Sequence, residues 1–337
     1  MITLEICLQP LCPGGAIAHE DLTLVPLTGD GYCRLDHLLA ADAIAAGVLT
    51  VTEVGEGGQV PILRAVNSAD CPVLLVDGEE LVGAKQNRIL NTSILLAGKS
   101  ETLIPVSCVE QGRWRYASPG FAAGMYSPPR LRARKSRDVG RNLRATGQAA
   151  SDQGAVWDQV AENLNALGAS SPTMSMHETF VARKAALDEF LRAMPYPAQA
   201  RGVMVFIGGG FAALDVFDRP ETLERLWPRL LRGYALDVMA RRNMPDMARM
   251  HVAPAVVMER LRLMACRPCP SVGMGEDWRF EADDFVGQAL IVGETCVHLC
   301  AFPNANPGGS QSHGPAAHIR PPSQRRRQKR PPKSDAT

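Results

Sequence analysis

The sequence predicts an α+β fold with a β-rich, sandwich- or barrel-like N-terminal part. Two observations support this. Short apolar runs alternate with turn residues over the first 117 positions, and the second half combines helical periodicity with glycine-centred hairpins. Several short strands at such spacing are typical of antiparallel sheets rather than of a parallel doubly wound sheet.

In the N-terminal part, residues 1–117, residues 35–46 carry leucine and isoleucine at helical spacing and predict a short helix. The predicted strands are residues 4–8, 22–27, 59–66, 72–76, 88–96 and 101–109.

Residues 118–154 are rich in arginine and show no apolar periodicity, so we expect a basic mobile loop or linker. Residues 155–302 form the helix and hairpin part. The predicted helices are 155–167, 176–194, 220–240, which Pro228 should kink or split, and 253–265. The predicted hairpins are 203–217 and 285–302.

Residues 303–337 are expected to be a disordered basic tail, because proline, glycine and arginine leave little to bury. The tail holds seven of the 36 basic residues and one of the 35 acids, so the rest of the chain is net acidic. This balance argues against a generally basic nucleic-acid-binding body. We expect the tail to make only weak, salt-sensitive contacts with anions.

The chain has no apolar stretch of about 20 residues and no signal-peptide pattern at its start, so we expect no membrane contact and a cytoplasmic location. Nine scattered cysteines do not resemble a small secreted disulfide scaffold. Cys266, Cys269, Cys296 and Cys300 could ligate zinc, but packing is the favoured interpretation, and no metal site is predicted. The sequence specifies neither a cofactor nor an oligomeric state.

The most unusual segment is 77–93, which places three acids, a lysine, an arginine and three amides between apolar strands. Glu110 and Arg113 follow the next strand. A carboxylate can act as a general base, and lysine and arginine can clamp an anion. The candidate catalytic residues are Glu79, Glu80 and Glu110. The candidate ligand-binding residues are Lys85, Gln86, Asn87, Arg88, Asn91 and Arg113.

Lys85 and Arg88 cannot point to one side of a straight strand, so we expect residues 77–87 to be partly irregular. We also expect Arg88 to face water in a pocket. The alternative is that the same cluster is an internal salt-bridge network. Two further residues are interpreted as structural. We expect Cys108 to be a buried thiol and His177 to be a surface or packing residue.

Four segments resemble the ARG and rhodanese-phosphatase-superfamily-associated protein family, in which ARG means ADP-ribosylglycohydrolase. They are residues 72–88 (PVLLVDGEELVGAKQNR), 104–114 (IPVSCVEQGRW), 202–209 (GVMVFIGG) and 215–237 (DVFDRPETLERLWPRLLRGYALD). The resemblance covers roughly residues 3–302 and implies a small-molecule ligand of nucleotide or ADP-ribose type, without naming a reaction. The hypothesis is a protein that binds such a ligand and, if it is an enzyme, hydrolyses it. The alternative is a non-enzymatic interaction or scaffold protein.

Overall fold

A computed structural model describes residues 2–29, 35–55, 57–243 and 252–304. It confirms the α+β class. The expected tail, 303–337, lies outside the described residues from position 305 onward.

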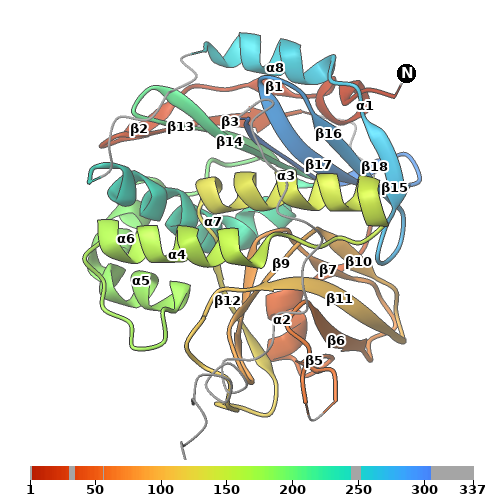
Figure 1. The fold of residues 1–337 in the computed structure, drawn as a ribbon. Helices are drawn as coiled ribbons and strands as arrows, with labels where there is room; N and C mark the ends of the chain where they lie inside the picture. Colours follow the sequence, from red (N-terminus) through yellow and green to blue (C-terminus); the bar gives the residue numbers. More distant parts are fainter. Residues whose placement is uncertain (1, 30–34, 56, 244–251, 305–337) are drawn as a thin grey trace, which may run out of the picture.

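The largest unit is an antiparallel nine-stranded sheet that joins the two ends of the described chain (Figure 1). Its order is β1-β3-β13-β14-β18-β17-β16-β15, and β2 also pairs with β3. The strands are β1 Cys12–Pro13, β2 Ile17–His19, β3 Leu22–Thr28, β13 Gly202–Ile207, β14 Gly210–Phe217, β15 Arg267–Pro270, β16 Glu276–Glu281, β17 Phe285–Val292 and β18 Thr295–Pro303. Because β3 pairs with β13, the expected division at residue 117 cuts through one sheet.

The remaining strands form the β-rich part, in which the expected barrel-like curvature appears as a half-barrel. A six-stranded sheet runs β12-β8-β9-β11-β6-β5, and a three-stranded sheet runs β10-β7-β4. The strands are β4 Leu38–Leu39, β5 Leu49–Glu53, β6 Ile62–Asn67, β7 Val73–Leu75, β8 Glu79–Gly83, β9 Arg88–Leu90, β10 Ile94–Leu96, β11 Ser100–Cys108 and β12 Phe121–Tyr126.

Two predictions at the N-terminus need correction. Residues 4–8 were expected to be a strand but contain the short helix α1, Glu5–Leu8. The helix expected over 35–46 is α2, Ala40–Ala45, preceded by β4. Leu4 and Leu8 are both buried, and a spacing of four residues places both on one face of a helical turn.

The prediction of a mobile basic loop over 118–154 is wrong. This segment contains β12 and the 18-residue helix α3, Pro129–Thr146, which begins at a proline and ends at Gly147 with a left-handed φ of 72°. The apolar pattern was obscured because Arg132 and Lys135 occupy core-facing positions. Helix α3 crosses the middle of the molecule between the nine-stranded sheet and the half-barrel (Figure 1).

The other helices are α4 Gln153–Ala166, α5 Met176–Ala182, α6 Lys184–Ala193, α7 Pro220–Arg241 and α8 Pro254–Arg262. Of these, α4 and α7 lie beside α3, α5 and α6 lie next to α4 and α7, and α8 lies over the nine-stranded sheet (Figure 1). Helix α7 continues past Pro228 as one element instead of splitting. None of the described helices is long and apolar enough to cross a membrane.

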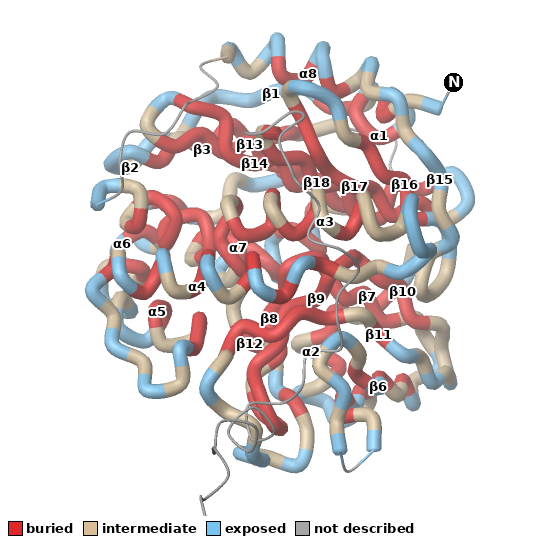
Figure 2. The backbone as a smooth tube through the Cα atoms, viewed as in Figure 1, coloured by how far each residue is buried: buried red, intermediate tan, exposed pale blue. Residues whose placement is uncertain are grey.

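Burial is continuous through the centre of the molecule, where strands of both units and the central helices meet (Figure 2). One hydrophobic cluster combines residues of the nine-stranded sheet with α4, α7 and the half-barrel, for example Val203, Trp227 and Ile89. A second cluster covers the opposite face of the nine-stranded sheet, under α1 and α8. A third fills the half-barrel. Central packing therefore joins the two units directly.

Candidate functional site

The nine predicted site residues do not form one site. Most are buried, and the structure separates them into three groups. The largest group lies around Arg88 and contains Lys85, Gln86, Asn87, Arg88, Glu110 and Arg113. Glu79 and Glu80 point to partners on two helices. Asn91 forms the third group, with Ser107 and Ala149 as its hydrogen-bond partners.

The loop between β8 and β9 is irregular, as expected for part of the segment 77–87. Gly83 has a φ of 132° and Ala84 has a φ of 39°, both in the left-handed region. The side chain of Asn87 holds the loop, because its Oδ1 accepts a hydrogen bond from the Gly83 N–H at 3.0 Å. A left-handed non-glycine residue is energetically unfavourable, and such strain is found preferentially at functional sites.

Arg88 has no solvent exposure, so the expectation that it faces water is wrong. Its Nη1 donates to Gln86 Oε1 at 3.2 Å. Its Nε and Nη2 have no hydrogen-bond partner among the described residues, although Nη2 lies 3.8 Å from Glu53 Oε1. These two atoms form one edge of the guanidinium, the edge that usually grips a carboxylate or phosphate in a bidentate manner.

The Trp114 ring lies over the Arg88 guanidinium. The Cζ of Arg88 lies 5.7 Å from the centre of this ring. Lys85 Nζ lies 5.4 Å from the centre of the same ring and 5.1 Å from the centre of the Tyr116 ring. Lys85 Nζ also donates to Gly57 O at 2.8 Å. Tyr116 is 51% exposed, so this arrangement runs from a buried cation to an exposed aromatic face.

Glu110 and Arg113 brace the loop from the far end of β11. Arg113 Nη2 donates to Glu110 Oε2 at 2.6 Å and to Asn87 Oδ1 at 3.0 Å. Burial raises the pKa of Glu110, but hydrogen bonds from Arg113, Thr173 and the Asn87 N–H outweigh burial and lower it from its usual value. A carboxylate held this strongly in its charged form is a poor proton acceptor. The geometry therefore makes Glu110 a brace for the loop.

Gln86 and Cys108 complete the buried wall beside Arg88. Gln86 Nε2 donates to Glu110 O at 2.8 Å, and the Cys108 thiol lies 3.2 Å from Gln86 Oε1. Burial raises the pKa of Cys108, against the opposing charge of Arg88. A buried, protonated thiol is a weak nucleophile, which agrees with the structural interpretation of Cys108.

The carboxylates of Glu79 and Glu80 pair with residues outside the Arg88 group. Glu79 Oε1 makes an ion pair with Arg229 Nη1 at 2.8 Å. Glu80 Oε2 lies 2.9 Å from Nδ1 of His177 on α5. Asn91 has a structural role, because its Oδ1 accepts from Ser107 and its Nδ2 donates to Ala149 O. Sequence reasoning missed the Glu80–His177 pair, because the partners are far apart in the chain.

A second buried polar cluster joins the half-barrel, α3 and the nine-stranded sheet. Arg132 donates to both oxygens of Asp215 at 2.7 and 2.9 Å, and Lys135 donates to Asp77. Burial raises the pKa of Asp215, but Arg132 and the hydrogen bond from His298 hold it well below its usual range. Two carboxylates thus face two cations, so the buried charges balance.

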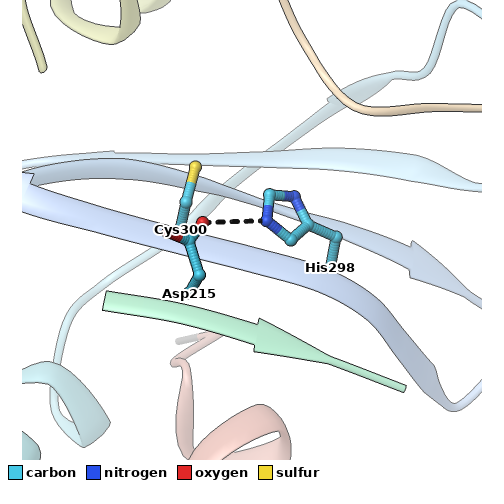
Figure 3. A group of neighbouring side chains, drawn as sticks. All are labelled: Asp215, His298 and Cys300. Atoms are coloured by element: carbon cyan, nitrogen blue, oxygen red, sulfur yellow. Dashed lines mark hydrogen bonds and ion pairs between the residues drawn. The ribbon is translucent and has the colours of Figure 1, made fainter. Parts of the chain in front are cut away.

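Asp215, His298 and Cys300 lie together in this cluster, with ligand atoms within 4.8 Å of one another (Figure 3). They do not suit a metal ion. Arg132 already occupies both Asp215 oxygens, and Tyr234 donates to one of them at 2.6 Å. Burial and the charge of Asp77 raise the pKa of the Cys300 thiol, whereas a metal needs a thiolate.

The four-cysteine zinc arrangement is also ruled out by strand geometry. Simple alternation along β18 puts Cys296, His298 and Cys300 on one face. However, Leu290 pairs with His298 and the next residue, Ile291, pairs with Cys296, so Val297 forms a bulge. Cys296 therefore packs in the cluster under α1 and α8, and Cys300 packs on the opposite face.

The model of the ARG and Rhodanese-Phosphatase-superfamily-associated Protein domain matches residues 11–302. The chain belongs to this family. The match begins before β1 and ends within β18, so it includes the nine-stranded sheet as well as the Arg88 loop. Comparisons with curated proteins and with solved structures gave no match.

Proposed function

We propose that the chain binds an ADP-ribose- or nucleotide-like ligand at the Arg88 loop, with an anionic group of the ligand on the Nε–Nη2 edge of Arg88. The observation that carries this proposal is a fully buried guanidinium whose Nε and Nη2 have no hydrogen-bond acceptor among the described residues. Buried donors without an acceptor are costly, and a phosphate accepts from both at once.

The surroundings suit the other parts of such a ligand. The Lys85 ammonium adds a second positive charge near the same ring system. Tyr116 offers an exposed aromatic face on which a base can stack. Stacking of a base on an aromatic side chain contributes about 1–3 kcal/mol. Glu79 and Asn91 have no role in this proposal, since both are engaged elsewhere.

A second candidate rests on Glu53. Its Oε2 is buried without a hydrogen-bond partner, and its Oε1 lies 3.8 Å from Arg88 Nη2. A small shift of this carboxylate would close the ion pair and complete an internal network. The chain would then be an interaction or scaffold protein, and the Arg88 cluster would serve stability alone.

Titration calorimetry with ADP-ribose, ADP and NAD tests the proposal. We expect binding by the wild type, about a 10-fold weaker Kd for Tyr116→Ala, and little change for Tyr116→Phe, which keeps the ring. Arg88→Gln should abolish binding. If no nucleotide binds, and Arg88→Gln changes only the free energy of unfolding, the scaffold interpretation replaces the proposal. A cytoplasmic location and weak anion contacts by the basic tail belong to the same proposal.

A further inference from the structure

The Glu80–His177 pair has the geometry of an oriented base. Glu80 is fully buried on β8, and its Oε2 lies 2.9 Å from His177 Nδ1. A carboxylate at this distance holds the proton of the ring on Nδ1, which leaves the lone pair on Nε2. His177 Nε2 has no partner among the described residues, and the side chain is 30% exposed. The free nitrogen therefore belongs to a ring that water can reach.

His298 provides an internal comparison. Its Nδ1 lies 2.6 Å from Ser93 Oγ and its Nε2 lies 3.2 Å from Asp215 Oδ1, so both ring nitrogens are occupied. The ring has no exposure. Serine, histidine and aspartate thus occur together without a reactive role, because nothing can reach them. His177 differs from His298 in two respects that matter for proton transfer: its Nε2 has no partner among the described residues, and its side chain is exposed to water.

The segment before α5 connects His177 to the Arg88 loop. Thr173 Oγ1 donates to Glu110 Oε1 at 2.8 Å, and Ser175 Oγ accepts from Asn87 Nδ2 at 3.2 Å. The Glu110 charge also acts on the His177 ring. The segment that carries His177 is therefore hydrogen-bonded to the loop that holds Arg88.

The charges around His177 are acidic. They are Glu80 on β8, Glu110 after β11 and Glu178 on its own helix, and they raise the pKa of His177 together with the hydrogen bond to Glu80, which has the largest effect and opposes burial. An acidic environment favours a transition state with developing positive charge, as in cleavage at a glycosidic carbon. It disfavours attack on phosphorus, where negative charge must be neutralised.

We propose that His177 is the general base, positioned by Glu80, for hydrolysis of a glycosidic bond in a nucleotide-like ligand. With NAD, the water oxygen bonds to the ribosyl carbon, and a proton of that water passes to His177 Nε2. The carbon–nitrogen bond breaks, and its electron pair leaves with neutral nicotinamide. ADP-ribose is the other product, and His177 releases the proton to solvent. The inference rests on the proposed nucleotide binding.

The test measures NAD binding by calorimetry and nicotinamide release by chromatography in the same preparations. We expect His177→Gln to lower the release rate about 100-fold or more with Kd nearly unchanged. Glu80→Gln should lower it about 10-fold and move the acidic limb of the pH–rate profile to lower pH, because it removes the largest influence that raises the pKa of His177. Glu178→Gln is the matched control, since it removes a nearby charge without removing a hydrogen bond.

Nitrogen-15 NMR of the wild type adds a readout that needs no variant, and we expect the neutral ring of His177 to carry its proton on Nδ1. A neutral ring with its proton on Nε2 would overturn the inference. Binding of NAD without nicotinamide release, or equal release by wild type and His177→Gln, would also overturn it while leaving the proposed function intact. No binding of any nucleotide would remove both.

Discussion

Replacing Arg132 by methionine should strongly destabilise the whole protein. Arg132 makes two hydrogen bonds to Asp215 and an ion pair with Asp77, and all three side chains are essentially buried. Methionine fits a helix and keeps much of the side-chain volume, so the change removes mainly the charge. Two buried carboxylates would then face only Lys135.

The expected loss follows from this imbalance. Removing one partner of a buried pair costs about 3–5 kcal/mol, because the other charge stays buried without compensation. Total stabilities of about 5–15 kcal/mol make this a large fraction. The deficit should shrink at acid pH. In the wild type the low pKa of Asp215 adds stability above its unfolded-state pKa, and this stability is lost as the pH falls through the folded value. The variant lacks that contribution.

Urea denaturation followed by circular dichroism measures the difference, with Arg144→Met as the matched control. Arg144 lies on the same helix and pairs with Glu281, but its side chain is 39% exposed. An exposed pair contributes about 1 kcal/mol or less. Equal losses for Arg132→Met and Arg144→Met would show that the buried network does not stabilise the fold, and would refute the reasoning.

Other consequences can be measured on the same preparations. Asp138 has its pKa raised to about 6, mainly by burial, so its ionisation opposes folding; Asp138→Asn should add about 3 kcal/mol of stability at pH 8, and the gain should vanish near pH 4. Gly83→Ala should cost about 2 kcal/mol or more, since a Cβ would lie 2.4 Å from Ser118 Oγ, whereas Gly147→Ala, with a left-handed φ but open space, should cost less. Elemental analysis should find no stoichiometric zinc, and a chelator should leave Tm unchanged; about one zinc per chain would contradict this. Removal of residues 305–337 should shift Tm by less than about 1 °C, because their composition offers little to bury, and a drop of several degrees would mean that they dock.

Much of the fold could be predicted because apolar periodicity and turn residues are local signals. The hairpins expected over 203–217 and 285–302 appear as β13–β14 and β17–β18. Helix α3 was missed for a physical reason. The sequence suggests that Arg132 and Lys135 are solvent-exposed, yet their counter-charges are distant in the chain: Asp77 lies in the turn before β8 and Asp215 lies on β14. Pairing of this kind has no local signature.

The candidate site shows the same limit. The irregular loop between β8 and β9 could be predicted from Gly78 and Gly83, and from the odd spacing of Lys85 and Arg88, which would put them on opposite faces of a straight strand. The pairing of Glu80 with His177 could not, because it depends on α5 bringing His177 against β8. Strand parity alone would also misplace Cys296, because the bulge at Val297 turns it to the face opposite Cys300.

The pairing of β3 with β13 has a consequence for how the chain is made. Leu27 pairs with Gly202, so the first strands emerge from the ribosome long before their partners. At about 5–20 residues per second, β3 waits for roughly 10–30 s with an unpaired edge while the half-barrel is synthesised. During that interval the half-barrel can fold around its own hydrophobic cluster. The edge of β3 that later pairs with β13 stays exposed, and it can pair with a strand of another chain. Nascent chains truncated before residue 202 should therefore bind chaperones through their first 30 residues.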